Sequence, residues 1–155
     1  MGIAFLTIGQ SLFAQSKQER KEQLEKKVTE VLDSNRLKIE VDRAVPSAGR
    51  SVNLTSSYAL QIHGDSIWAS LPYYGRAYSA PYGGSGGIHF KEIASGKKVS
   101  SLKKGGSRIE FRVKTNDDTY TFQVDVYTNG SATIHVSPVN KQSISYYGDL
   151  DLNVE

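Results

Sequence analysis

Apolar and polar residues alternate along most of the chain after residue 35, which is the pattern of half-buried β-strands. The clearest pair of such runs lies within residues 108–126. A four-residue loop at residues 115–118 joins the two runs and places Val113 opposite Tyr120. The apolar side chains of both runs then share one face. We therefore predict an antiparallel hairpin here, with a polar outer face.

A second hairpin is predicted over residues 58–71, with its turn at Gly64 and Asp65. Glycine followed by another residue is typical of a two-residue type II′ turn. That turn pairs Ile62 with Ile67, and the register gathers the apolar side chains on one face, namely Tyr58, Leu60, Ile62, Ile67, Ala69 and Leu71. Turn chemistry and apolar pattern therefore agree.

The turn at Asn129 and Gly130 can be read in two registers. A two-residue turn would place Thr133 and His135 on the core face, which is the wrong polarity. A three-residue loop at residues 128–130 pairs Val124 with Ile134 instead. We predict the three-residue form, with Gly130 in the left-handed conformation of a bulge.

Three further strands complete the pattern. The first covers residues 36–45, has Leu37, Ile39, Val41 and Val45 in phase, and is followed by a loop at residues 47–57. The second is a short strand at residues 88–90. The last covers residues 142–154, with Gly148 as a kink. Before the strands, residues 17–34 predict a charged helix that would dock on the sheet through a narrow apolar stripe of Leu24, Val28, Val31 and Leu32. The same stripe could instead bind a partner.

These elements predict an α+β domain: an N-terminal helix followed by a strongly curved, mostly antiparallel sheet of about eight strands, open or partly closed into a barrel. A chain of 155 residues suits one such domain.

Residues 1–14 are interpreted as a secretory signal peptide cleaved after Ala14, which leaves residues 15–155 as the domain. The apolar run at residues 3–13 is too short to span a bilayer, and the charged residues begin abruptly at Lys17. No Lys or Arg precedes the run, and Leu12 is bulkier than the usual residue at its position. The alternative is a buried N-terminal helix.

Composition narrows the function classes. The absence of cysteine excludes disulfides, thiolate catalysis, cysteine-bound zinc and a lipid-anchored cysteine. The net charge of +3 comes largely from residues 17–27 and 97–104, without the dense basic stripe of a nucleic-acid-binding protein. We therefore expect no nucleic-acid partner, and no transmembrane segment in the mature chain.

The most unusual segment covers residues 71–87, which is rich in Pro and Gly and carries the candidate ligand-binding residues Tyr73, Tyr74, Arg76, Tyr78 and Tyr82. Tyrosine offers a flat amphipathic surface, and Tyr and Arg are frequent at binding hot spots. This tyrosine loop could bind sugar rings or peptide. Alternatively, its tyrosines pack over an open end of the sheet.

Other motifs are weaker. The glycines at residues 83–87 precede a strand and lack the Lys of a phosphate loop. Asp149, Asp151 and Asn153 have calcium-loop spacing, but apolar residues fill the gaps. The three histidines lie on predicted polar strand faces without metal-motif spacing. We predict no cofactor, no metal and no assigned catalytic residue.

A resemblance follows from residues 71–78, from residues 81–83 with Gly87, Ile88 and Phe90, from Asn129-Gly130, and from the late run Gln142-x-Ile144-x-Tyr146-x-Gly148. Together these resemble a family of small exported Bacteroidetes proteins that carry a domain of unknown function. The resemblance implies export to the periplasm or beyond, without lipid anchoring here, and implies no reaction.

The functional interpretation is a non-catalytic binding or accessory protein of the periplasm or cell envelope, with a glycan, a peptide or an envelope protein as partner. The alternative is a small hydrolase acting on envelope or glycan material. A third is a structural subunit that adds an edge strand to a partner.

Overall fold

A computed structural model describes residues 3–75 and 87–153, and within the first helix it describes side chains from Ser16 onward. In these residues one helix precedes nine strands. They are α1 (Ile3–Asp33), β1 (Arg36–Pro46), β2 (Val52–His63), β3 (Ser66–Pro72), β4 (Gly87–Ile93), β5 (Ser95–Ser101), β6 (Ser107–Lys114), β7 (Thr119–Val126), β8 (Ser131–Pro138) and β9 (Ile144–Leu150).

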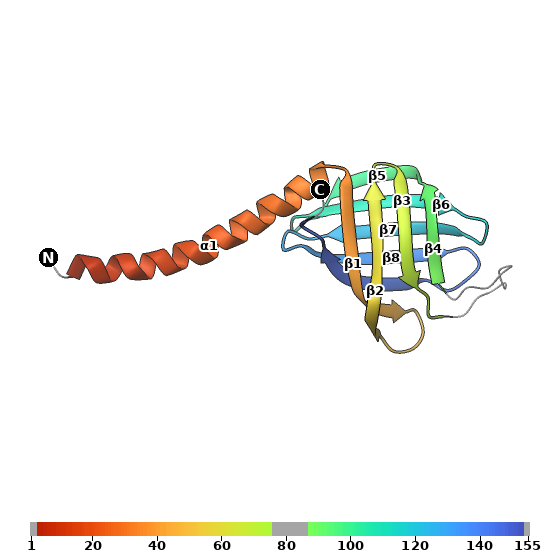
Figure 1. Cartoon of the computed structure of the whole chain (residues 1–155), viewed down its shortest axis with the longest axis horizontal. Helices are drawn as coiled ribbons and strands as arrows, with labels where there is room; N and C mark the ends of the chain where they lie inside the picture. The colour runs from red at the N-terminus through yellow and green to blue at the C-terminus, as the bar shows by residue number, and fades with distance from the viewer. Residues whose placement is uncertain (1–2, 76–86, 154–155) are drawn as a thin grey trace.

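All nine strands form one antiparallel sheet in the order β4-β3-β2-β1-β9-β8-β7-β6-β5. The sheet curls so that β1 to β4 cross in front of the strands from β5 to β8 (Figure 1). Side chains close the gap between its halves, because the ring of Phe90 on β4 lies 5.7 Å from that of Tyr120 and 6.0 Å from that of Phe122, both on β7. The predicted α+β fold with a curved sheet is confirmed, and the sheet is a nearly closed barrel.

The predicted hairpin registers are confirmed. Ile62 pairs with Ile67, and Val113 pairs with Tyr120. Val126 pairs with Ala132 and Val124 with Ile134, as the three-residue loop requires, and Gly130 has a φ of 89°.

The alternation of buried and exposed residues in β1 is interrupted, although the sequence predicted that Val41 and Val45 share one face. A bulge between Val41 and Arg43 shifts the register against both β2 and β9. Ala44 is therefore buried, whereas Val45 is only half-buried, so its assignment to the core face was wrong. One extra residue moves every later side chain to the other face. The predicted loop at 47–57 was also too long, since β2 begins at Val52.

The sequence pattern missed β5, which accounts for the ninth strand. This strand is mostly polar, since five of its seven residues are Ser or Lys. All but one are exposed, so no apolar face marked the strand. It is held by pairing with β6 alone, at one edge of the sheet.

The C-terminal part of α1 packs against the barrel, as its apolar stripe predicted. Val28 and Val31 are buried, and Leu24 and Leu32 pack partly against the core. Figure 1 shows the rest of the helix projecting away from the sheet. The helix begins at Ile3, earlier than the predicted residue 17. Within the described residues, no helix has the length and apolar content that a membrane span requires.

Gly148 on β9 lies against the bulged part of β1. A Cβ atom at residue 148 would overlap the carbonyl oxygen of Glu40. Glycine therefore allows β9 and β1 to approach closely at this point. The last strand ends at Leu150, and Val154, which the prediction placed in it, lies outside the described residues.

Candidate functional site

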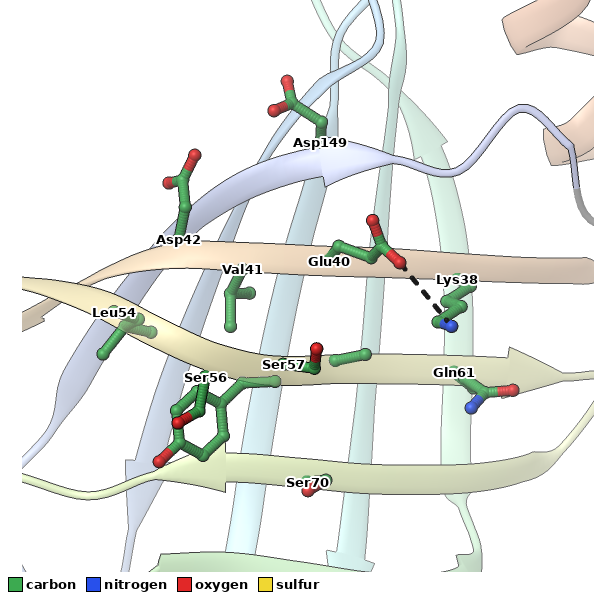
Figure 2. A pocket seen from close by; sticks show the side chains of 12 residues that line it. Lys38, Glu40, Val41, Asp42, Leu54, Ser56, Ser57, Gln61, Ser70 and Asp149 are labelled. Atoms are coloured by element: carbon green, nitrogen blue, oxygen red, sulfur yellow. Dashed lines mark ion pairs between the residues drawn. The ribbon is translucent and has the colours of Figure 1, made fainter.

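The outer face of the sheet is hollowed where the register of β1 shifts, between Val41 and Arg43, against both β2 and β9 (Figure 2). This outer groove has a volume of about 490 Å³, within the range of about 300–1,000 Å³ usual for small-molecule sites. Its lining combines carboxylates, hydroxyls, an amide and a few apolar side chains: Lys38, Glu40, Val41, Asp42, Leu54, Ser56, Ser57, Tyr58, Ala59, Gln61, Ser70 and Asp149.

Acidic side chains are concentrated along one side of the outer groove. Glu40 on β1 pairs directly opposite Asp149 on β9, and Asp42 follows on β1. Like charges opposite each other destabilise a sheet. Lys38 offsets this in part, with its ammonium nitrogen 3.6 Å from a carboxylate oxygen of Glu40, but both side chains are solvated and the pair is weak. The sequence thus accepts a local electrostatic cost at the groove.

An exposed aromatic group lies beside the outer groove. Trp68 pairs opposite Gln61 of the groove lining, and its side chain is 36% exposed. The imidazole of His63 stacks on the indole with ring centroids 5.0 Å apart, and the ammonium of Lys91 lies 4.3 Å from the indole centroid. Because β3 lies between β2 and β4, these two neighbours approach Trp68 from different strands. We call Trp68, His63 and Lys91 the tryptophan platform.

Two Ser–His pairs lie on the outer face of the sheet. The hydroxyl of Ser70 and Nδ1 of His89 are 3.3 Å apart, and the hydroxyl of Ser145 and Nδ1 of His135 are 2.8 Å apart. Acyl transfer by such a pair also needs N–H donors aimed at the oxyanion. Ser70 and Ser145 both lie inside strands that are paired on both sides. Their backbone N–H groups are therefore committed to strand pairing and do not form an oxyanion hole. The histidines do lie on the polar face, as predicted.

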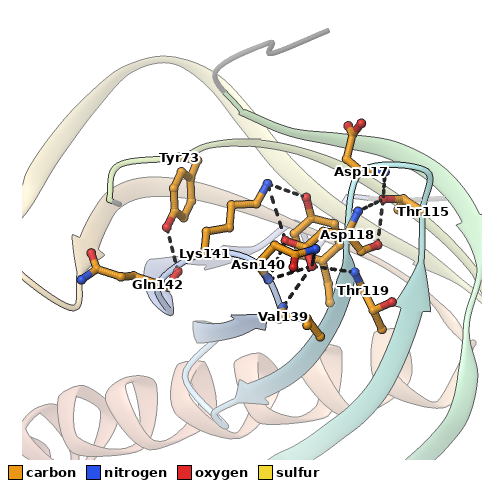
Figure 3. A network of polar contacts seen from close by, with 10 residues as sticks. Tyr73, Thr115, Asp117, Asp118, Thr119, Val139, Asn140, Lys141 and Gln142 are labelled. Carbon is orange, nitrogen blue, oxygen red and sulfur yellow. Dashed lines mark hydrogen bonds and ion pairs between the residues drawn. The ribbon is translucent and has the colours of Figure 1, made fainter. Parts of the chain in front are cut away.

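A buried polar cluster is found where β7 begins and β8 is followed by β9 (Figure 3). Asp118 accepts hydrogen bonds from the backbone N–H groups of Thr119 at 2.8 Å, Val139 at 3.0 Å and Asn140 at 3.1 Å. Lys141 donates a 3.0 Å hydrogen bond to the hydroxyl of Tyr120. Burial raises the pKa of Tyr120, and the hydrogen bond with Lys141 partly opposes the rise. This cluster ties two loops together.

The tyrosine loop begins next to this cluster. Tyr73 packs partly against the core and donates a 2.8 Å hydrogen bond to the carbonyl oxygen of Gln142. Tyr74, the next residue, is 38% exposed. Arg76, Tyr78 and Tyr82 lie outside the described residues. Tyr73 thus fits the packing interpretation and Tyr74 remains available to a ligand, so binding by this loop stays a prediction.

The residues with calcium-loop spacing are divided between two roles. Asp149 lines the outer groove, whereas a carboxylate oxygen of Asp151 accepts a 2.9 Å hydrogen bond from the N–H of Asn153. In the part of the chain that the structure describes, no three His, Asp or Glu side chains lie close enough to hold a metal ion.

Sequence reasoning missed the outer groove. Its lining comes from four strands and surrounds the register shift between Val41 and Arg43, which strand pairing reveals and residue types do not. The one available signal was the loss of apolar alternation after Val41, where Ala44 takes over the buried position.

The described residues define an antiparallel domain of one helix and nine strands, with a polar groove on its outer face. Comparison with family models matches residues 19–150 to the Domain of unknown function (DUF4251). The chain belongs to this family, which confirms the resemblance seen in the sequence.

A solved structure shares the fold. It is the crystal structure of a DUF4251 family protein from Bacteroides eggerthii DSM 20697, with a TM-score of 0.62 and 16% sequence identity, covering 82% of this chain and 86% of that one. A comparison with curated proteins gave no significant match.

Proposed function

We propose that this domain is an exported, non-catalytic binding protein of the periplasm or cell envelope, and that its ligand lies in the outer groove and on the tryptophan platform. The observation that carries the proposal is the continuity of the two surfaces. Gln61, which lines the groove, is the direct cross-strand neighbour of Trp68. Ligand sites are concave and combine aromatic contacts with placed polar groups that fix the orientation of the ligand.

The electrostatics of the outer groove support a binding role. Glu40 and Asp149 face each other across two strands at a cost to the sheet. Sequences break local rules of this kind mainly at functional sites. Export is supported by the apolar run of residues 3–13, which ends at Ala14.

The hydrolase alternative rests on Ser70 and His89, since Ser70 also lines the outer groove. The paired backbone around Ser70 favours binding over acyl transfer, because a hydrolase needs free N–H donors at the reacting carbonyl. The two functions differ in whether the ligand is changed.

A single nuclear magnetic resonance experiment tests both the binding function and the hydrolase function. The ¹⁵N-labelled full chain would be titrated with two mixtures, one of oligosaccharides released from bacterial envelope polysaccharides and one of short peptides from digested envelope proteins. We expect shifts of the Trp68 indole N–H and the Gln61 side-chain amide with one mixture, and unchanged ligand signals after prolonged incubation. New reducing-end or peptide-terminus signals that disappear in Ser70→Ala would establish the hydrolase instead. Unchanged chemical shifts at Trp68 and Gln61 with both mixtures would overturn the proposal.

A further inference from the structure

The charges around the proposed site restrict its ligand. The outer groove carries the carboxylates of Glu40, Asp42 and Asp149 against one ammonium, that of Lys38. A ligand with phosphate or carboxylate groups would be repelled there. The tryptophan platform has the opposite character, because the ammonium of Lys91 lies 4.3 Å from the indole centroid. A cationic ligand would be repelled at that end.

A ligand that spans both regions is therefore best uncharged, and the lining shows how it would be held. Ser56, Ser57 and Ser70 offer hydroxyls, and Gln61 offers an amide. Carboxylates accept hydrogen bonds from a row of ligand hydroxyl groups, and an amide both accepts and donates them. An apolar ligand would leave these polar groups without partners, which is costly.

The indole of Trp68 supplies the apolar contact. Trp and Tyr side chains offer broad flat surfaces to a ligand. Lys91 now covers part of the indole, but it is exposed, and a cation–π contact at an exposed site is weak. A ligand ring can therefore displace the ammonium and take its place on the indole.

We infer that the ligand of this site is a neutral, hydroxyl-rich chain, an uncharged oligosaccharide, with one sugar ring on Trp68 and its neighbours in the outer groove. The inference rests on the proposed function and names its ligand class. It also assigns Lys91 as a side chain that competes with the sugar for the indole.

Tryptophan fluorescence gives a direct readout, because Trp68 is the single tryptophan of the chain. The full chain would be titrated with neutral tri- to hexasaccharides of N-acetylglucosamine, glucose, mannose and galactose. Chitosan oligomers serve as the cationic counterpart and oligogalacturonides as the anionic one. We expect saturable fluorescence changes with at least one neutral series and none with either charged series.

Variants would be compared by titration calorimetry, which does not depend on the indole. Trp68→Leu and, independently, Gln61→Ala should each weaken binding by about tenfold or more, as expected at a binding hot spot. Lys91→Ala should strengthen binding by about two- to fivefold, since the competing contact is gone. The matched control is Tyr147→Ala, which removes an exposed aromatic ring that also lies under a cation, Arg43, but outside the groove lining.

The failures are distinguishable. Binding of chitosan or oligogalacturonide without any neutral series would overturn the oligosaccharide inference and leave the proposed function intact. Equal losses in Tyr147→Ala and Trp68→Leu would place the ligand elsewhere and overturn both. If no oligosaccharide of any charge binds, the inference is wrong, and the peptide titration then decides the proposed function.

Discussion

The ammonium nitrogen of Lys141 lies 4.0 Å from a carboxylate oxygen of Asp118, and the two side chains are 10% and 0% exposed. Asp118 is satisfied mainly by the backbone N–H groups that surround it, and Lys141 by the hydroxyl of Tyr120. The pair therefore joins the loop before β7 to the loop after β8 at the end of the barrel where the tyrosine loop begins.

Asp118→Asn should destabilise the fold by about 3 kcal/mol, because it removes a buried charge and leaves Lys141 without its counterion. The neighbouring Asp117→Asn is the control, since Asp117 is exposed and its loss should change stability by no more than about 0.5 kcal/mol. Chemical denaturation of both variants measures the difference. Equal stabilities would mean that the backbone donors alone hold the loops.

Gly130→Val should cost about 1 kcal/mol or more, because Gly130 has a φ of 89° that a β-branched residue adopts with strain. Gly130→Asn is the matched variant and should cost less, since Asn tolerates the left-handed region. Thermal melts of the two proteins test this. Identical melting temperatures would show that the strain is relieved by a change in loop conformation.

Stability should fall at alkaline pH through Tyr146. Burial raises the pKa of Tyr146 far above its ordinary value of about 10. In the unfolded chain the phenol ionises near pH 10, whereas in the folded protein it keeps its proton. The unfolded state therefore binds fewer protons above that pH, and the free energy of unfolding decreases by up to about 1.4 kcal/mol per pH unit.

Tyr146→Phe should flatten this decrease. At neutral pH it should cost about 1–2 kcal/mol, because the hydroxyl donates a hydrogen bond to the carbonyl of Pro72. The control is Tyr147→Phe, which changes an exposed neighbour and should leave the slope unaltered. Urea denaturation between neutral pH and pH 11 or so gives both quantities. A slope in Tyr146→Phe equal to that of the native chain would contradict the assignment.

The two described tyrosines of the tyrosine loop should respond differently to truncation. Tyr73→Ala should cost about 3 kcal/mol, since it opens a cavity against the core and removes a hydrogen bond to Gln142. Tyr74→Ala should change the melting temperature little, because its side chain is 38% exposed. A large loss at Tyr74 as well would make this part of the loop structural and end its candidacy as a binding surface.

If the protein is exported, its signal peptide is cleaved after Ala14, and the mature protein begins at or close to Gln15. The apolar run ending at Ala14 has the length of a signal-peptide core. Amino-terminal sequencing of the protein from its native cell measures the cleavage site. Recovery of the intact Met1 from the cytoplasm would contradict both export and the envelope setting of the proposed function.

Strand pairing within hairpins could be predicted from the sequence, because turn length and apolar alternation fix the register locally. Gly64 and Gly130 set two turns, and the polarity of Thr133 and His135 excluded the wrong register at the second. The apolar stripe of the helix could also be predicted from the sequence. Val28 and Val31 are buried because their spacing places them on one face.

The sequence by itself thus determined the helix, every strand of the described residues except β5, most of the buried faces, and the membership of Tyr73 and Tyr74 in an unusual loop. Only the tertiary structure decided that β1 lies between β2 and β9, that a bulge after Val41 buries Ala44 in place of Val45, and that Trp68 lies beside the outer groove. The physical reason is that these relationships depend on pairing between segments far apart in the chain. Such pairing is set by the packing of the whole barrel, and no local pattern of residue types encodes it.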